Sequence, residues 1–309
     1  MTTLLAVVLP VFLVLGFGYL ATARGWIGES AIDGLMKFSQ GFAIPCLLFR
    51  AISTLDIGAH FDPALLGSFY LGALSGFAVG LLGALLLFRR PLEDAVAIGF
   101  VGLFSNSLLL GLPITERAYG AGALEANYAI IAIHSPFCYA IGITVMETVQ
   151  ARGGPLRHLP GRILKAMFRN SLILGIVLGL AVNLTGITLP QVAQEALDLL
   201  VRAALPTALF GLGGVLYRYR PEGDLRVIFW AVGCSLLVHP LVTYGLGRAW
   251  GLEVPAFRSA VVTAAMAPGV NAYLFADMYG RARRVAASSV LIGTALTVLT
   301  ATVWLALLP

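Results

Sequence analysis

Two short stretches of this sequence combine polar side chains with helix-breaking residues inside apolar surroundings. The first, FSNSLLLGLP at 104–113, contains Ser105, Asn106, Ser107, Gly111 and Pro113. The second, APGVNAY at 267–273, contains Pro268, Gly269, Asn271 and Tyr273. Glycine lets a chain leave helical geometry and proline removes a backbone donor, so both stretches should free backbone groups beside amide and hydroxyl side chains. Such a set of hydrogen-bond donors suits a small anion.

Two histidines form a second group with chemical potential. His134 and His239 lie deep in apolar stretches, each close to a proline. Histidine changes charge near neutral pH, so the pair could form a proton relay. One hydrogen bond to a neighbouring helix would equally explain either residue, and both interpretations stay open.

Other kinds of site have little support in the sequence. Cys46, Cys138 and Cys234 lack metal-ligand spacing, and we expect neither a metal nor a cofactor. There is no P-loop, no HExxH motif and no nucleophile elbow, which argues against an enzyme. Asp277 has Arg281 four residues later, and this spacing predicts a local ion pair.

The amino-acid composition indicates that these stretches belong to a membrane protein. The chain has 309 residues, of which 59% are hydrophobic and 11% charged. Apolar runs of roughly 20 residues, each long enough to cross a bilayer, follow one another with short polar joints. The first resembles a signal peptide at its end, but no Lys or Arg precedes Arg24, so we expect a retained helix. The ten predicted spans are 4–23, 34–54, 64–88, 95–119, 123–148, 165–187, 193–217, 226–250, 257–279 and 285–308.

The Lys and Arg residues indicate how the chain is oriented. All but five of the 20 lie in or beside the joints after the first, third, fifth, seventh and ninth spans. Cytoplasmic loops carry an excess of Lys and Arg, so both termini should face the periplasm of a bacterial inner membrane. The net charge of +5 is spread over short loops, which argues against nucleic acid as a partner. The five exceptions are Arg50, Arg117, Arg202, Arg248 and Arg258.

Short matches between the two halves indicate an internal repeat. IPCLLFRA at 44–51 matches LPTALFGL at 205–212, and ERAYG at 116–120 matches ADMYG at 276–280. The two matches have nearly the same offset. Together they predict that the chain consists of two related halves.

The repeat divides the chain into two domains of opposite orientation. A cytoplasmic linker, 151–162, separates 1–150 from 163–309, and each side holds five spans. Because five is odd, the halves cross the membrane in opposite senses, and in transporters with such inverted repeats broken helices meet near the midplane to bind substrate. We expect the fourth and ninth spans to meet in this way. Gly, Pro and Asn also occur in membrane helices for packing alone, so either break by itself would favour a structural role.

Several segments together resemble the auxin efflux carrier family, which includes plant auxin carriers and bacterial dicarboxylate permeases. The resemblance covers nearly the whole chain, and its motifs are specific as a set. The segments are IPCLLFRA at 44–51, NSLLLGLPITERAYG at 106–120, FRNSLILGIVLGL at 168–180, AAMAPGVNAYLFADMYG at 264–280 and VLIGTALTVLTATVWL at 290–305.

The resemblance implies an all-helical fold of ten transmembrane helices, shared with bile-acid sodium symporters. Helices 1, 2, 6 and 7 would form a scaffold, and helices 3–5 and 8–10 a transport domain in which helices 4 and 9 cross. Implied substrates are organic anions, mostly carboxylates, moved by an elevator-like mechanism, and a homodimer through the scaffold would follow the family precedent. The motif residues carried over are Asn106, Gly111, Pro113, Pro268 and Asn271.

The chain departs from the family pattern at a few points. Ser107 stands where the family has Thr, and Ser171 where a Pro often follows the residue matching Asn170. The long central loop of the plant carriers is absent, which indicates the compact bacterial type.

Together these observations predict a secondary transporter for a small organic anion. Asn106 and Asn271 would donate hydrogen bonds to the carboxylate, with Ser105, Ser107 and backbone N–H groups around Gly269. Three alternatives remain: a sodium-coupled symporter of the bile-acid type, a membrane anion sensor that does not transport, and a channel. The residues do not decide whether protons or sodium would be coupled.

Overall fold

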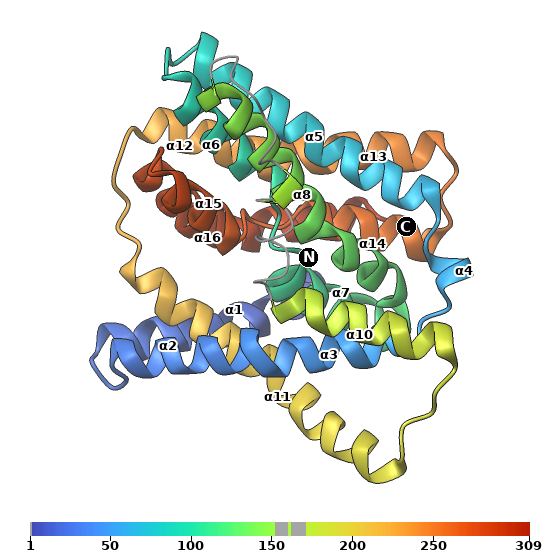
Figure 1. Ribbon diagram of the computed structural model, residues 1–309. Helices are drawn as coiled ribbons and strands as arrows, with labels where there is room; N and C mark the ends of the chain where they lie inside the picture. The colour runs from blue at the N-terminus through green and yellow to red at the C-terminus, as the bar shows by residue number, and fades with distance from the viewer. Residues whose placement is uncertain (1, 152–159, 162–170) are drawn as a thin grey trace.

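The computed structural model describes residues 2–151, 160–161 and 171–309, and this part of the chain is helical apart from short connections and one isolated β-bridge. The predicted all-helical fold is therefore confirmed. The linker 151–162 and the start of the sixth predicted span, with Asn170, lie largely outside the described residues. The α-helices (Figure 1) are α1 (Thr2–Ala23), α2 (Glu29–Phe38), α3 (Ile44–Ser53), α4 (Ile57–His60), α5 (Pro63–Leu86), α6 (Leu92–Leu103), α7 (Leu112–Tyr119), α8 (Glu125–Ala151), α10 (Ser171–Thr185), α11 (Gln191–Arg218), α12 (Leu225–Gly233), α13 (His239–Ala249), α14 (Val254–Ala264), α15 (Val270–Tyr279) and α16 (Arg283–Leu307).

Seven helical stretches of the described residues are long and apolar enough to cross a hydrocarbon layer. Large apolar side chains on several of them point outward: Leu13, Leu86, Leu199 and Leu299 are 62–69% exposed. Such a surface suits contact with lipid. The chain is a multi-pass membrane protein, as its composition predicts. The seven stretches are Leu5–Ala23, Glu29–Ser53, Pro63–Leu86, Glu125–Ala151, Gln191–Arg218, Leu225–Ala249 and Arg283–Leu307.

Two of the remaining predicted spans are interrupted helices. In the fourth span, α6 ends at Leu103 and the chain becomes helical again at Ser107; in the ninth, α14 ends at Ala264 and α15 begins at Val270. The second break includes Pro268 and Gly269, as predicted. The predicted position of the first break, at Gly111 and Pro113, is wrong, because both residues lie in the continuous helical segment that begins at Ser107.

A π-helical turn before the proline explains why the helix continues there. The turns η1 (Ser39–Ala43), η2 (Ser107–Gly111) and η4 (Cys234–Val238) each end two residues before a proline, respectively Pro45, Pro113 and Pro240. Proline has no N–H, and its ring clashes with the carbonyl four residues earlier, so a wider turn accommodates it. Pro113 therefore lies within a continuous helical segment, and the interruption lies upstream of it.

Glycines let two pairs of helices approach at backbone distance. α1 packs along α11, and α3 along α10. A Cβ atom on Gly213 would collide with the Leu15 carbonyl of α1, and one on Gly175 would lie 2.9 Å from the Pro45 Cα of α3. Small residues commonly allow this close contact in membranes. In Figure 1, α1, α2, α3, α10 and α11 lie together in the lower half, with α5, α12 and α13 in the upper half.

The interrupted helices lie at the centre of the molecule. All residues of α6 from Ala95 to Leu103 are buried, as are those of α14 from Ser259 to Ala264. α6 packs against α5, α8, α12, α15 and α16. Both breaks are thus surrounded by protein, which is where irregular backbone is tolerated at membrane depth.

The predicted ion pair between Asp277 and Arg281 is wrong. The Asp277 Oδ1 atom lies 3.1 Å from Arg283 Nε, and Arg281 Nη2 lies 3.7 Å from Glu93 Oε1 at the start of α6. α15 ends before Gly280, which has a left-handed φ of 66°. This turn takes Arg281 off the helix face that it would share with Asp277.

Candidate functional site

The two interrupted helices meet at their breaks and pair through the backbone. Asn106 donates its backbone N–H to the Ala267 carbonyl at 2.8 Å, and Gly269 donates to the Phe104 carbonyl at 2.8 Å. These bonds form an antiparallel bridge between Ser105 and Pro268. Backbone groups that lose helical partners need others inside a membrane, and here each break supplies them to the other.

Side chains from the surrounding helices satisfy further carbonyls at the breaks. A carbonyl only accepts, so the His134 Nε2 atom carries the hydrogen that it shares with Ser105. The donor and acceptor atoms are Cys138 Sγ and Leu103 O at 3.8 Å, His134 Nε2 and Ser105 O at 3.1 Å, and Ser235 Oγ and Met266 O at 3.2 Å. Each of these three carbonyls therefore has one hydrogen-bond partner.

Asn106 begins the second part of the fourth span. Its Oδ1 atom accepts a hydrogen bond from the Leu109 backbone N–H at 3.3 Å, which caps the turn that follows. Its amide nitrogen, Nδ2, is buried and has no hydrogen-bond partner among the described residues, and the same holds for Ser105 Oγ. Buried polar atoms are normally paired, so these two point to a partner that binds there.

Asn271 lies in the first turn of α15 and is held by a neighbouring tyrosine. Tyr139 of α8 donates its hydroxyl hydrogen to Asn271 Oδ1 at 3.2 Å, which leaves the Asn271 amide hydrogens for other acceptors. The backbone N–H groups of Val270 and Asn271 have no acceptor within the helix, because they belong to its first turn. The amino end of α15 therefore presents donors and partial positive charge.

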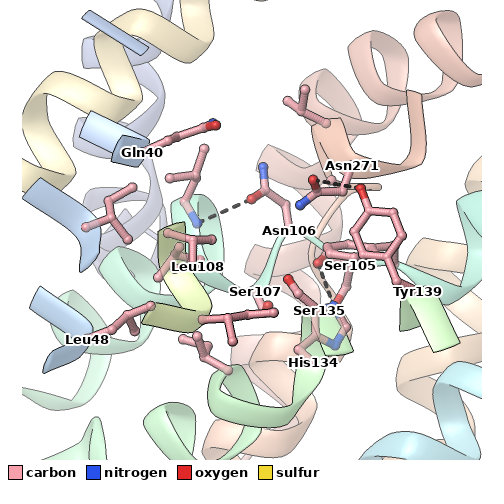
Figure 2. A pocket seen from close by; sticks show the side chains of 18 of the residues that line it. Gln40, Leu48, Ser105, Asn106, Ser107, Leu108, His134, Ser135, Tyr139 and Asn271 are labelled. Carbon is pink, nitrogen blue, oxygen red and sulfur yellow. Dashed lines mark hydrogen bonds between the residues drawn. The ribbon is translucent and has the colours of Figure 1, made fainter. Parts of the chain in front are cut away.

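These groups line a cavity of about 320 Å³ between α3, α8, α10 and the two breaks. Figure 2 shows Asn106, Asn271 and Tyr139 near one another, with His134 and Ser135 beside Ser105. Gln40 and Ser171 add polar groups, while isoleucines, leucines, Phe104 and Val270 form the apolar part of the wall. None of the described lining residues is Asp, Glu, Lys or Arg. The cavity has the size and the mixed lining of a small-molecule site.

The sequence-predicted site residues separate into two groups. Ser105, Asn106, Ser107, Gly269, Asn271 and His134 line the cavity. The others lie elsewhere: Gly111 packs near Met266, Pro268 packs near Gly293, the Tyr273 ring lies 4.9 Å from that of Tyr219, and His239 Nε2 lies 3.2 Å from Phe69 O. Pro113 lines a second cavity.

The sequence reasoning did not identify Tyr139, Ser135 or Gln40. Ser135 follows His134 directly and would have been found by asking which polar residues accompany the histidine. Tyr139 and Gln40 give no such signal, because only the packing of α8 and of the turn η1 brings them to the cavity.

The second cavity, of about 770 Å³, lies between α1, α3, α7, α8 and α11. Three arginines line it: Arg50, whose Nε lies 3.3 Å from Asp198 Oδ1; Arg117, which donates to the Val7 and Ala6 carbonyls of α1; and the exposed Arg202. Buried leucines of one cluster divide the cavities. Leu48 and Leu109 line the first cavity, and Leu47 and Leu112 the second.

The chain is similar in sequence to several proteins named as transporters or carriers. The chain is 27% identical over 314 residues to the protein named "Putative malonate transporter" of Rhizobium meliloti, covering 98% of this chain and 95% of that protein. It is 26% identical to an uncharacterized transporter of Methanothermobacter thermautotrophicus, and that match covers 87% of this chain and 86% of the other protein. A shorter match is to auxin efflux carrier component 2 of Arabidopsis thaliana. It is 25% identical and covers 48% of this chain and 23% of that protein.

The family match extends over nearly the whole chain. The profile described as "Membrane transport protein" matches residues 3–305. Since the match includes both breaks and all the helices around them, the chain belongs to this membrane transport protein family, the auxin efflux carrier family.

Proposed function

We propose that this protein is a secondary transporter that moves a small organic anion, a mono- or dicarboxylate, across a bacterial inner membrane by elevator-like alternating access. The observation that carries the proposal is the donor set at the meeting breaks. Asn106 Nδ2 is buried without a partner among the described residues, and Val270 and Asn271, the first residues of α15, line the same cavity. A carboxylate offers the acceptor oxygens that these donors lack.

Malonate is the first substrate to test. The Rhizobium meliloti relative that carries malonate in its name matches nearly the full length of this chain. A dicarboxylate of three carbons fits within about 320 Å³. One of its carboxylates would accept from Asn106 and Ser105, and the other from Asn271 and the amino end of α15.

The packing of the helices supports an inverted repeat of ten spans. Exchanging the halves 1–150 and 163–309 turns the pair of α1 and α11 into the pair of α10 and α3, and both pairs are in contact. The same exchange turns α6 and α8 into α14 and α16, which also touch. We assign α1, α2, α3, α10 and α11 to a scaffold and the helices from α5 to α8 and from α12 to α16 to a transport domain.

The two cavities would then be the two routes of access. Gln40 and Ser171, in the first cavity, belong to the ends of spans that the positive-inside pattern predicts to face the cytoplasm, with both termini in the periplasm. Arg50, Arg117 and Arg202, in the second, belong to the predicted periplasmic ends. Movement of the transport domain past the leucines would carry the anion from one side to the other. A homodimer through the scaffold helices stays a prediction.

The site gives little support to the alternative of a sodium-coupled symporter. Carbonyls at the breaks already accept hydrogen bonds from Asn106, Gly269, His134 and Ser235. A sodium ion at these carbonyls would have to share their oxygens with the present donors.

Counterflow tests the proposal. Proteoliposomes containing the protein and unlabelled malonate should accumulate external radiolabelled malonate, with sodium or with choline replacing it. A sodium requirement would establish the symporter instead. Binding in a thermal-shift assay without counterflow would indicate a sensor, and unitary currents in a planar bilayer would indicate a channel. Absence of binding and of counterflow across a panel of carboxylates would refute the anion site.

A further inference from the structure

The cavity at the breaks has no charged side chain among its described lining residues to balance an anion. Its described polar lining consists of amides, hydroxyls and one imidazole. Moving a charge from water into such surroundings is costly unless a counter-charge accompanies it. The cost is larger for a dianion such as malonate than for an anion with one charge. The inference that follows rests on the proposed function.

His134 is the lining side chain that can supply the counter-charge. Its Nε2–H donates to the Ser105 carbonyl at 3.1 Å, which leaves Nδ1 as the acceptor nitrogen. The Nδ1 atom lies 3.7 Å from the Cys138 sulfur, whose single hydrogen is directed to the Leu103 carbonyl. A proton can therefore add at Nδ1 while the hydrogen bond to Ser105 stays intact, and the new N–H would face the sulfur of Cys138, a weak acceptor.

The surroundings of His134 provide no permanent counter-ion within the described chain. The titratable groups around it are Tyr70 of α5, Cys138 and Tyr139 of its own helix, and His239 of α13 on the far side of Phe69. No hydrogen bond or ion pair among the described residues joins its imidazole to Asp, Glu, Lys or Arg. The rings of Phe69 and Phe104 lie edge-on, with centroids 5.5 and 4.7 Å from that of His134. A bound carboxylate would thus supply the negative charge that an imidazolium at His134 lacks in the described residues.

We propose that anion binding and protonation of His134 are coupled, so that the protein carries one proton with each anion. The added proton forms an N–H bond at Nδ1 when the anion enters, and it leaves to water when the anion departs on the other side. Coupling is reciprocal: the anion favours the proton as much as the proton favours the anion. The Ser105 carbonyl joins the imidazole to the break that also holds Asn106.

A pH gradient distinguishes coupled from uncoupled transport. Proteoliposomes with the membrane potential clamped by valinomycin and potassium should accumulate malonate above its external concentration when the outside is acidic. His134→Gln keeps a side-chain N–H for Ser105 but cannot become cationic; it should bind malonate more weakly and lose this accumulation, and the counterflow that remains at saturating malonate should not depend on pH. His239→Gln, the matched control away from the cavity, should keep it. Accumulation by His134→Gln at the wild-type level would overturn the proposal.

Calorimetry of the wild-type protein gives a second test, which does not depend on whether a substituted protein folds. Malonate binding, measured in two buffers of different ionisation enthalpy at a pH where malonate is fully ionised, should show uptake of one proton. Binding without proton uptake would overturn the inference, while the proposed transport would stand if counterflow is observed. Loss of counterflow in the wild-type protein would instead refute the proposed function.

Discussion

Replacing Asn106 with serine should weaken anion binding without destabilising the empty protein. Asn106 has two separate tasks: Oδ1 caps the Leu109 N–H at 3.3 Å, while Nδ2 is buried without a partner among the described residues. Serine caps a helix about as well as asparagine, so the first task survives. Removing an unpaired buried donor costs nothing and relieves an unfavourable burial. The free energy of unfolding of the empty protein should therefore stay equal or rise.

The loss in binding follows from the hydrogen bond that a carboxylate would receive from Nδ2. A hydrogen bond to a charged group contributes about 1.5–3 kcal/mol. At a factor of ten for each 1.4 kcal/mol, the dissociation constant of malonate should rise by about 10- to 140-fold. Isothermal titration calorimetry measures this constant, and the melting temperature of the ligand-free protein measures the stability.

Asn183 provides the matched control. Its Nδ2 donates to the Ile52 and Leu55 carbonyls at 2.9 and 2.7 Å, and it does not line the cavity. Asn183→Ser should therefore lower stability by about 1–3 kcal/mol and leave malonate affinity unchanged. If Asn106→Ser lowered the melting temperature as much as Asn183→Ser and changed affinity less than twofold, the assignment of Asn106 Nδ2 to the anion would be wrong.

Three further predictions follow from other contacts. Tyr139→Phe removes the hydroxyl that holds Asn271 Oδ1, and should weaken malonate binding by about fivefold, equivalent to about 1 kcal/mol, in the same titration; unchanged affinity would exclude this positioning role. Arg117→Gln removes two hydrogen bonds to carbonyls of α1, and should speed amide hydrogen exchange at the amino end of that helix by about fivefold in mass spectrometry; equal rates would contradict it. Gly213→Ala, whose Cβ meets the α1 backbone, should lower the melting temperature, whereas Gly16→Ala, with open space around it, should not; equal effects would argue against close packing of α1 on α11.

The sequence predicted the membrane-spanning helices because the bilayer imposes a simple requirement. Apolar runs such as those within 63–86 and 191–218 satisfy their backbone groups only as helices, so composition and length determine the element. Polar residues in an apolar run are costly unless they have partners. Ser105, Asn106, Ser107 and Asn271 could therefore be assigned to a site before any packing was known.

The position of the interruption in the fourth span could not be predicted from its helix-breaking residues. Gly111 and Pro113 indicate where a helix is weak, but a π-helical turn accommodates Pro113 locally. The chain opens instead at 104–106, where Ala267 and Gly269 of the other half supply backbone partners. Those partners are distant in the sequence, and no local pattern contains them.

The sequence by itself determined that this is a helical membrane protein and which short segments carry polar donors, because hydrophobic length and helix propensity are local properties. Only the tertiary structure decided that Tyr139 holds Asn271, that His134 contacts Ser105, and that Pro113 belongs to a different cavity. Each of these depends on how separate helices are placed against one another. Hydrogen bonds act over about 3 Å, so a site built from several helices is fixed only when all of them are packed.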